Sequence, residues 1–320
     1  MAYKVLIPQN IVQQGKDYLL QRGYEIKMGS GITVDAIKRD VVDCDAILAR
    51  TAPFPAEVLE AAPKLKVIGR HGVGVDNIDV AAAERMGIWV TNAPLSNSNT
   101  VAELTLGFII ALGRQFTHTE REFRKGNFEI RNKVLGMDLE GKTLGVLGLG
   151  KIGRLVAAKA RLGLGMKILG YDPYVPQDKA PEGVEMTDSW EEAFARPDFV
   201  TIHMPFAGKK LVGMKEFSLM KPTAYFINVA RGELLHEEEL VEALRSKKIA
   251  GAALDVFAKE PPDADNPLLS LENIIVTPHN AALTTECTTR MAEHAAIGID
   301  EVLSGKTPSW PVNRPASPRK

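Results

Sequence analysis

The chain has 320 residues, of which 45% are hydrophobic and 25% charged, and its formal net charge is −1. This composition is ordinary for a folded globular protein, and the balanced charge argues against binding of nucleic acid or an anionic membrane through a basic surface. A chain of this length exceeds what one hydrophobic core usually serves, so two domains are expected.

Cysteine usage and the chain ends favour a cytoplasmic protein. Cys44 and Cys287 are too few for a disulfide framework and too far apart for a thiolate metal site, so we expect free thiols and no metal. The N-terminus leads directly into a strand without the apolar region of a signal peptide. The longest apolar run, 104–112, is too short to span a membrane. The C-terminal basic pair, Arg319 and Lys320, is expected to be a solvated tail.

The first hundred residues alternate short apolar runs with helical patterns. Because parallel strands joined by helices form a sheet that is covered on both faces, this pattern predicts a small α/β domain. The predicted strands are 4–8, 24–28, 46–49, 65–68 and 88–91, and the predicted helices are 11–21, 33–42 and 55–62.

A glycine-bearing segment, Arg70-His71-Gly72-Val73-Gly74, follows the fourth of these strands. Ligands of open α/β sheets bind beyond the carboxyl ends of the strands, and alternating glycines can present successive N–H groups to an anion. A plain turn that needs glycine for its dihedral angles explains the segment equally well. Both interpretations stay open on this stretch alone.

The most informative stretch is 143–172, which reads as strand, tight turn, helix and strand. In its turn, Gly148 permits the sharp bend, Gly150 lets a pyrophosphate approach the backbone, and Gly153 lets helix and strand pack closely. Asp172 stands about 20 residues further on, where an acid accepts hydrogen bonds from the adenosine ribose and repels the extra phosphate of NADP. The motif therefore predicts a dinucleotide site that prefers NAD.

The remaining elements continue the α/β pattern. One long helix is predicted from Thr100 to Lys125, and a second from Thr284 to Leu303, which returns to the N-terminal domain. His118 and His294 fall on these helices with charged neighbours and are expected on solvated faces. Further strands are predicted at 199–204, 225–230, 251–257 and 274–277, and further helices at 189–195 and 237–247.

Three residues of complementary chemistry follow the last strands: Arg231, Glu260 and His279. Imidazole titrates near neutral pH, a carboxylate beside it raises its pKa, and a guanidinium can hold a carboxylate or carbonyl. Each residue alone has a structural explanation, as a surface ion-pair partner, a solvated acid or a structural histidine. Together in a nucleotide-binding frame they favour hydride transfer at an alcohol or ketone carbon.

The chain resembles the D-isomer-specific 2-hydroxyacid dehydrogenases over nearly its whole length. GLGKIG with Asp172, NVARG, DVFAKEP and TPH occur in the order of that family. The resemblance implies that Arg231 binds the substrate, that His279 is the acid–base residue and that Glu260 tunes it. It also implies contacts to NAD from Thr100, Gly148, Gly150, Lys151, Ile152, Gly153, Asp172, His203, Met204, Val229, Ala230, Asp255 and Ala281.

Within the family, the segments around Arg50 and Arg70 are most similar to those of the 3-phosphoglycerate dehydrogenases. The resemblance implies that both arginines face a substrate phosphate and that Gly72, Val73 and Gly74 cradle the substrate carboxylate. The short C-terminus suggests that the serine-sensing regulatory domain of many such enzymes is lacking. His71 and Asn280 depart from the usual family residues, which leaves the substrate open.

The resemblance implies an α/β fold of two doubly wound parallel-sheet domains, one a Rossmann domain and one a smaller flavodoxin-like domain. We expect 1–98 and 285–320 to bind the substrate and 99–284 to bind NAD. Closure of the domains is expected about hinges near 95–100 and 282–285, and a homodimer through the nucleotide-binding domain is implied.

The leading interpretation is an NAD-dependent dehydrogenase of D-3-phosphoglycerate that serves serine biosynthesis. Alternative substrates are glycerate or hydroxypyruvate, glyoxylate, lactate and bulkier 2-oxo acids. Formate dehydrogenase, a relative, is disfavoured because it should lack the Glu260 partner. A protein of a different class, an NAD-sensing corepressor, would need a peptide-docking surface that no feature of the sequence indicates.

Overall fold

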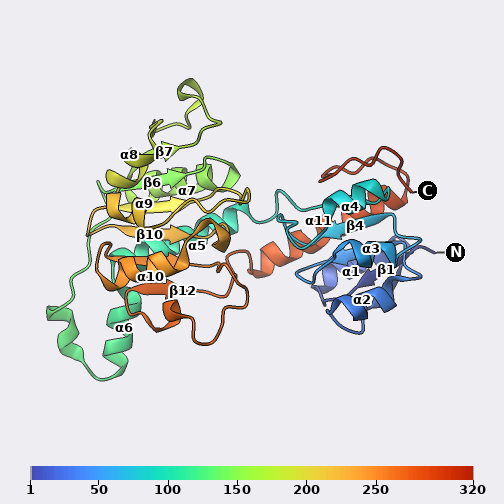
Figure 1. Ribbon diagram of the computed structural model, residues 1–320, viewed down its shortest axis with the longest axis horizontal. Helices are drawn as coiled ribbons and strands as arrows, with labels where there is room; N and C mark the ends of the chain where they lie inside the picture. The colour runs from blue at the N-terminus through green and yellow to red at the C-terminus, as the bar shows by residue number, and fades with distance from the viewer. Residues whose placement is uncertain (1, 320) are drawn as a thin grey trace. The chain divides into compact units, whose positions relative to one another are not determined.

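The computed structural model describes residues 2–319 and divides the chain into two compact units (Figure 1). The first unit runs up to Asn97 and resumes at Ala282, and the second comprises Ser98–Ala281. Each unit is a parallel sheet with helices on both faces, which confirms the predicted fold class. No helix within residues 2–319 is both long enough and apolar enough to cross a membrane.

The first unit has five parallel strands in the order β2-β1-β3-β4-β5, the flavodoxin-like arrangement. Strand side chains alternate between two cores: Val5 and Ile7 pack with α1 and α11, whereas Leu6 faces α2, α3 and α4. The strands are β1 (Lys4–Ile7), β2 (Glu25–Met28), β3 (Ala46–Ala49), β4 (Val67–Arg70) and β5 (Trp89–Thr91), and the helices are α1 (Gln13–Gln21), α2 (Val34–Val41), α3 (Ala56–Glu60), α4 (Val80–Arg85) and α11 (Thr285–Leu303).

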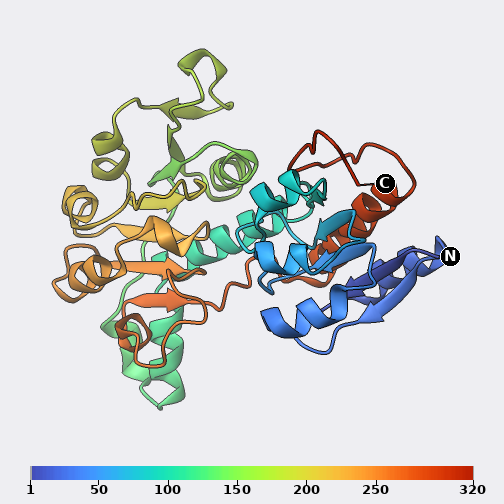
Figure 2. The ribbon, with the colours of Figure 1, turned by 45° about the vertical axis from the view of Figure 1, so that its right-hand side comes forward.

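Helix α11 explains why the first unit needs both ends of the chain. A Cβ atom at Gly69 of β4 would lie 2.5 Å from the carbonyl oxygen of Ala295, so only glycine lets the helix approach the strand this closely. Figure 2 shows the red helix lying along the blue and cyan strands. The C-terminal helix is therefore part of the core of the first unit.

The second unit has seven parallel strands in the order β12-β11-β10-β9-β6-β7-β8. The strand order reverses between β6 and β9, which is where a Rossmann sheet binds its ligand. The strands are β6 (Thr143–Leu147), β7 (Lys167–Tyr171), β8 (Val184–Met186), β9 (Phe199–Ile202), β10 (Tyr225–Asn228), β11 (Gly251–Leu254) and β12 (Ile274–Val276). Helices α5 (Ser98–Gly113) and α7 (Lys151–Leu164) pack together, and α6 (Phe116–Arg124), α8 (Trp190–Ala195), α9 (Met214–Leu219) and α10 (Glu237–Arg245) complete the unit.

The prediction of one helix from Thr100 to Lys125 is wrong. The chain breaks into α5 and α6 at Gln115, whose φ of 54° is left-handed. The Gln115 side chain donates a hydrogen bond of 2.7 Å to the Tyr225 hydroxyl, which holds the break against the sheet. Periodicity did not reveal this break, and it also missed the short elements α4, β8 and α9.

Two expectations of solvated side chains are also wrong. Arg319 donates to the carbonyl oxygens of Met86 and Ala62 at 2.8 and 2.7 Å, so the tail packs onto the first unit. His294 lies against Trp310 with ring centroids 4.4 Å apart, and burial lowers its pKa. The other half of the predicted basic pair, Lys320, lies outside the described residues.

Candidate active site

His279 and Glu260 meet at the carboxyl edge of the second sheet. Glu260 lies in the loop after β11, and His279 follows β12, the neighbouring parallel strand. The imidazole Nδ1 is 2.6 Å from Glu260 Oε2, and the His279 side chain remains about half exposed (52%). A carboxylate that holds one ring nitrogen leaves the other nitrogen available for proton transfer to a ligand.

The backbone of His279 adopts a left-handed conformation with φ of 50°, which is unfavourable for a residue with a side chain. Asp255 compensates for this. Its carbonyl oxygen accepts the His279 N–H at 2.8 Å, and its carboxylate accepts the N–H groups of Asn280 and Ala281, each at 2.9 Å. The Thr277 hydroxyl donates to the same carboxylate at 2.5 Å. One buried acid thereby fixes the whole loop that carries His279.

The electrostatics favour a charged pair at His279 and Glu260. The hydrogen bond to Glu260 raises the pKa of His279, against the opposing effect of burial. Burial pushes the pKa of Glu260 upward, but the hydrogen bonds from His279 and the Phe257 N–H outweigh it and hold the pKa below its ordinary value. Burial raises the pKa of Asp255. The arrangement therefore stabilises an imidazolium at His279.

Arg231 belongs to the same group of residues. It follows β10, and its Nη1 donates to the Ala230 carbonyl oxygen at 2.7 Å while the Asn228 side chain donates to the Arg231 carbonyl oxygen at 2.9 Å. Its positive charge lowers the pKa of both Glu260 and His279. The three residues predicted from sequence therefore lie together in one unit.

The glycine-rich turn fits a dinucleotide. A Cβ at Gly153 would lie 1.9 Å from the Gly148 carbonyl oxygen, so Gly153 is required by the protein's own packing, and Gly148 has a φ of 93°. A Cβ at Gly150 would meet no atom within 4 Å. Because packing does not require this glycine, the open space above it suits a pyrophosphate at the N-terminus of α7, which begins at Lys151 and has no side-chain cap.

The other residues predicted to contact NAD surround this turn or the neighbouring strand ends. Asp172 accepts the N–H groups of Leu149 and Tyr174 at 2.7 and 2.9 Å, which ties the end of β7 to the turn. Burial lowers the pKa of His203 to about 3, so its ring is neutral. Val229, Ala230 and Ala281 follow β10 and β12, Met204 follows β9, Ile152 lies in the first turn of α7, and Thr100 is buried in α5.

The residues predicted to bind the substrate lie together in the first unit. Arg50 directly follows β3, and Arg70 ends the neighbouring β4. The carbonyl oxygens of Gly72 and Val73 accept bonds from the Ala93 N–H and the Asn92 side chain, each at 2.8 Å. Within residues 2–319, the N–H groups of Val73 and Gly74 have no acceptor, as an anion cradle requires. Position 72 requires glycine for another reason, because its φ of 139° is a backbone conformation that residues with a side chain rarely adopt.

His71, one of the two departures from the family pattern, is buried beside this cradle. Burial and the charge of Arg50 lower its pKa to about 4. The ring is therefore neutral at physiological pH and adds no charge to that of the arginines. Asn280, the other departure, contributes its backbone N–H to Asp255.

A family model for the D-isomer-specific 2-hydroxyacid dehydrogenase NAD-binding domain matches residues 106–281, more than half of the chain. The chain belongs to this family. Over 99% of its length it is 42% identical to the D-3-phosphoglycerate dehydrogenase of Methanocaldococcus jannaschii. The chain spans about 60% of the length of the curated relatives that it matches.

Solved structures of the family share the fold. A protein from Thermus thermophilus has a TM-score of 0.89 with 33% identity, covering 97% of this chain and 100% of that one. An NADPH-dependent glyoxylate/hydroxypyruvate reductase from Sinorhizobium meliloti has a TM-score of 0.88 with 27% identity, covering 99% and 100%. The structural likeness extends through both units.

Sequence reasoning missed part of the site. For Asp255 the resemblance implies only a contact with NAD, whereas its carboxylate also builds the His279 loop. The TPH motif contains Thr277, but the resemblance implies no role for this residue, which donates to Asp255. The sequence signal was present, because Asp255 directly follows a buried strand and Thr277 directly follows the next one. An acid and a hydroxyl at adjacent strand ends are placed to meet.

Proposed function

We propose that the protein is an NAD-dependent oxidoreductase that interconverts a D-2-hydroxy acid and the corresponding 2-oxo acid. The observation that carries the proposal is the His279–Glu260 pair, with an Nδ1–Oε2 distance of 2.6 Å, in a domain that matches the NAD-binding domain of the family. Bound NAD would supply the acceptor for the hydride that leaves C2 of the hydroxy acid. The residues of the chain supply proton transfer, orientation and charge.

In the direction of oxidation, neutral His279 takes the hydroxyl proton of the substrate. Glu260 stabilises the imidazolium that forms, as the raised pKa of His279 indicates. Arg231 forks onto the carboxylate or carbonyl end of the substrate and fixes the carbon that reacts. In the reverse direction, the imidazolium returns the proton to the carbonyl oxygen. Positioned proton transfer of this kind contributes about 10²- to 10⁴-fold in rate.

For NAD, we assign the pyrophosphate to the turn at Gly148, Gly150 and Gly153 with Lys151 and Ile152, and the adenosine ribose to Asp172. Two features support this assignment: the open space over Gly150 and the uncapped N-terminus of α7. We assign the nicotinamide half to the strand ends of β9 to β12, with the residues Thr100, His203, Met204, Val229, Ala230, Asp255 and Ala281.

The substrate that we propose is D-3-phosphoglycerate, which would place the protein in serine biosynthesis. Relatives 39–42% identical over 98–99% of the chain carry that name. We assign the first unit to substrate binding, with Arg50 and Arg70 on the phosphate and the turn at Gly72, Val73 and Gly74 on the carboxylate. Two adjacent arginines and two N–H groups without acceptors suit a substrate with two anionic groups.

The test is kcat/KM with NAD for D-3-phosphoglycerate, D-glycerate and D-lactate, in wild type and in Arg50→Ala. We expect a strong preference for the phosphorylated acid that collapses in the variant. Arg85→Ala, an exposed arginine of α4 in the same unit, is the matched control and should keep the preference. His279→Ala should lower turnover by orders of magnitude while NADH still binds. Unchanged turnover in His279→Ala would refute the proposed mechanism.

A second candidate is glyoxylate or hydroxypyruvate reduction, which the structural likeness to the Sinorhizobium meliloti reductase favours. The same residues would perform this reaction, without a substrate phosphate. Comparison of hydroxypyruvate with phosphohydroxypyruvate in the direction of reduction separates the two candidates. A preference for hydroxypyruvate that Arg50→Ala leaves unchanged selects the second.

We further propose a cytoplasmic homodimer that associates through the nucleotide-binding unit. Helix α6 buries none of its own residues and stands out from the layered body of its unit in Figures 1 and 2. Phe123 of this helix is 60% exposed and Leu135, further along the chain, is 83% exposed, which suits contact of this segment with a second copy. Cys44 and Cys287 are both buried thiols, which suits a reducing compartment. Phe123→Asp should shift the mass measured by light scattering from dimer to monomer.

A further inference from the structure

The loop that carries Glu260, residues 258–266, depends on polar contacts for its position. Residues 258–261 are exposed, and the next buried residue along the chain is Leu268. Because so little of the loop is buried, apolar packing contributes little to holding it. Glu260 Oε1 accepts the N–H of Phe257 at 3.0 Å, but this contact is local. Other groups must attach the loop to the rest of its unit.

Two features attach the loop to the segment that leads into α10. A Cβ at Gly232 would lie 1.9 Å from the carbonyl carbon of Phe257, so only glycine lets the two backbones approach this closely. This contact brings the start of the loop close to α10, which begins at Glu237. Glu237 Oε1 accepts the Ala258 N–H at 2.5 Å, and Glu237 Oε2 accepts the Asn266 side-chain amide at 3.4 Å. One carboxylate therefore binds both ends of the loop.

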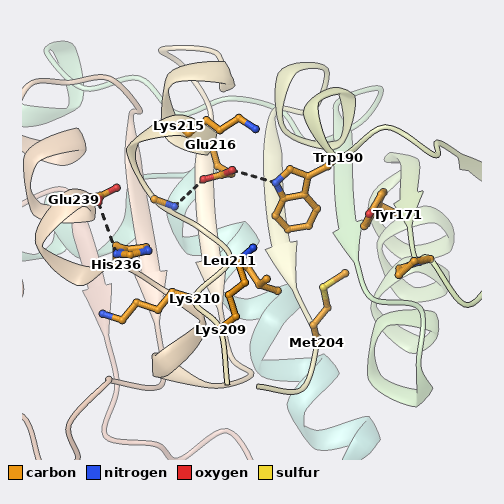
Figure 3. Close-up of a pocket in the computed structure, with 12 residues that line it drawn as sticks. Tyr171, Trp190, Met204, Lys209, Lys210, Leu211, Lys215, Glu216, His236 and Glu239 are labelled. Atoms are coloured by element: carbon orange, nitrogen blue, oxygen red, sulfur yellow. Dashed lines mark hydrogen bonds and ion pairs between the residues drawn. The ribbon is translucent and has the colours of Figure 1, made fainter. Parts of the chain in front are cut away.

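Three acids form the first turn of α10, and the ordinary explanation for all three is a favourable interaction with the helix N-terminus. Their contacts separate them. Glu238 is exposed and accepts no hydrogen bond within residues 2–319. Glu239 serves α9 instead, because it accepts the Met214 N–H and lies 3.7 Å from His236 Nδ1 (Figure 3). Of the three, Glu237 is the acid that contacts the loop.

We propose that Glu237 is a positioning residue for proton transfer, which holds the loop so that Glu260 faces His279. The inference rests on the proposed function, in which His279 exchanges the substrate proton. Within the second unit, the charged groups that act on the His279 ring are Glu260 and Asp255, which raise its pKa, and Arg231, which lowers it. The hydrogen bond from Glu260 is the largest of these effects. A loop that is no longer held weakens this bond, so the pKa of His279 falls.

The test measures the pKa of His279 in the enzyme without substrate, by NMR of the histidine ring protons, with the signal assigned from His279→Gln. We expect Glu237→Ala to lower this pKa. We also expect kcat/KM for reduction at neutral pH to fall about ten-fold, as loss of one hydrogen bond to a charged group allows. Glu237→Gln keeps an acceptor for the Ala258 N–H and should restore both values. Glu238→Ala removes an acid from the same turn and is the matched control, which should keep the wild-type pKa.

The double variant Glu237→Ala/Glu260→Gln separates a positioning role from a direct one. If Glu237 acts through Glu260, the double variant has the same His279 pKa as Glu260→Gln alone. An unchanged pKa in Glu237→Ala, or a further fall in the double variant, would overturn the proposal. An equal fall in Glu237→Gln would assign the effect to the charge of Glu237 and also overturn it. Wild type without turnover of any 2-hydroxy acid would instead refute the proposed function, while the NMR measurement would still report the effect of Glu237 on His279.

Discussion

Asp255→Asn tests whether one buried acid sets the position of the acid–base residue. The carboxylate accepts the N–H groups of Asn280 and Ala281 at 2.9 Å and the Thr277 hydroxyl at 2.5 Å. An asparagine keeps the shape and one acceptor oxygen, but it presents an NH₂ donor to one of the N–H donors. The substitution therefore removes one charge-assisted hydrogen bond and sets two donors against each other.

Loss of one hydrogen bond to a charged group costs about 1.5–3 kcal/mol. The left-handed backbone of His279, with φ of 50°, costs about 1–2 kcal/mol in wild type as well, so it narrows the margin by which the loop is held and leaves the change caused by the substitution at about 3 kcal/mol or less. A change of about 3 kcal/mol lowers the ratio of correctly placed to displaced His279 by about 10²-fold. We expect kcat/KM to fall by up to about that factor.

The assay combines kcat/KM for D-3-phosphoglycerate with the midpoint of thermal unfolding. Asp198→Asn is the matched control, because Asp198 accepts the Thr143 N–H at 2.9 Å and Lys221 Nζ at 2.8 Å at the opposite edge of the same sheet. Both variants should lower the unfolding midpoint by several degrees, but only Asp255→Asn should lose turnover. If Asp255→Asn kept wild-type kcat/KM, the idea that Asp255 positions His279 would be wrong.

Three further predictions follow from individual contacts. Glu260→Gln removes the carboxylate that raises the pKa of His279, so this pKa falls. The pH profiles of kcat/KM for oxidation and for reduction should both move to lower pH, and an unmoved profile would contradict the pairing of His279 with Glu260. Gly153→Ala places a Cβ 1.9 Å from a carbonyl oxygen and should prevent folding. Gly150→Ala places its Cβ in free space, so this variant should fold with a normal circular dichroism spectrum but bind NADH weakly. Equal behaviour of the two variants would refute the assigned roles. Arg319→Ala removes hydrogen bonds to three carbonyl oxygens and should destabilise the first unit by about 1–2 kcal/mol in denaturant unfolding. Turnover in buffer should be retained. An unchanged midpoint of denaturant unfolding would show that the tail is dispensable.

The sequence by itself determined the fold class and the main motif. The buried parallel strands, such as 46–49 and 167–171, are short apolar runs of the length of a strand. Such runs can be recognised in the sequence without knowledge of tertiary contacts. The glycine-rich turn can also be recognised in the sequence, because the spacing of its glycines reflects local backbone geometry. Order along the chain also placed Arg231, Glu260 and His279 at neighbouring strand ends.

Only the tertiary structure decided features that depend on residues distant in sequence. The break at Gln115 depends on Tyr225, and burial of Arg319 depends on carbonyl oxygens of residues 62, 65 and 86. The second role of Asp255 depends on a loop that begins more than twenty residues later along the chain. Local propensity carries no information on such partners, because each bond forms only after the sheet has brought the two segments together.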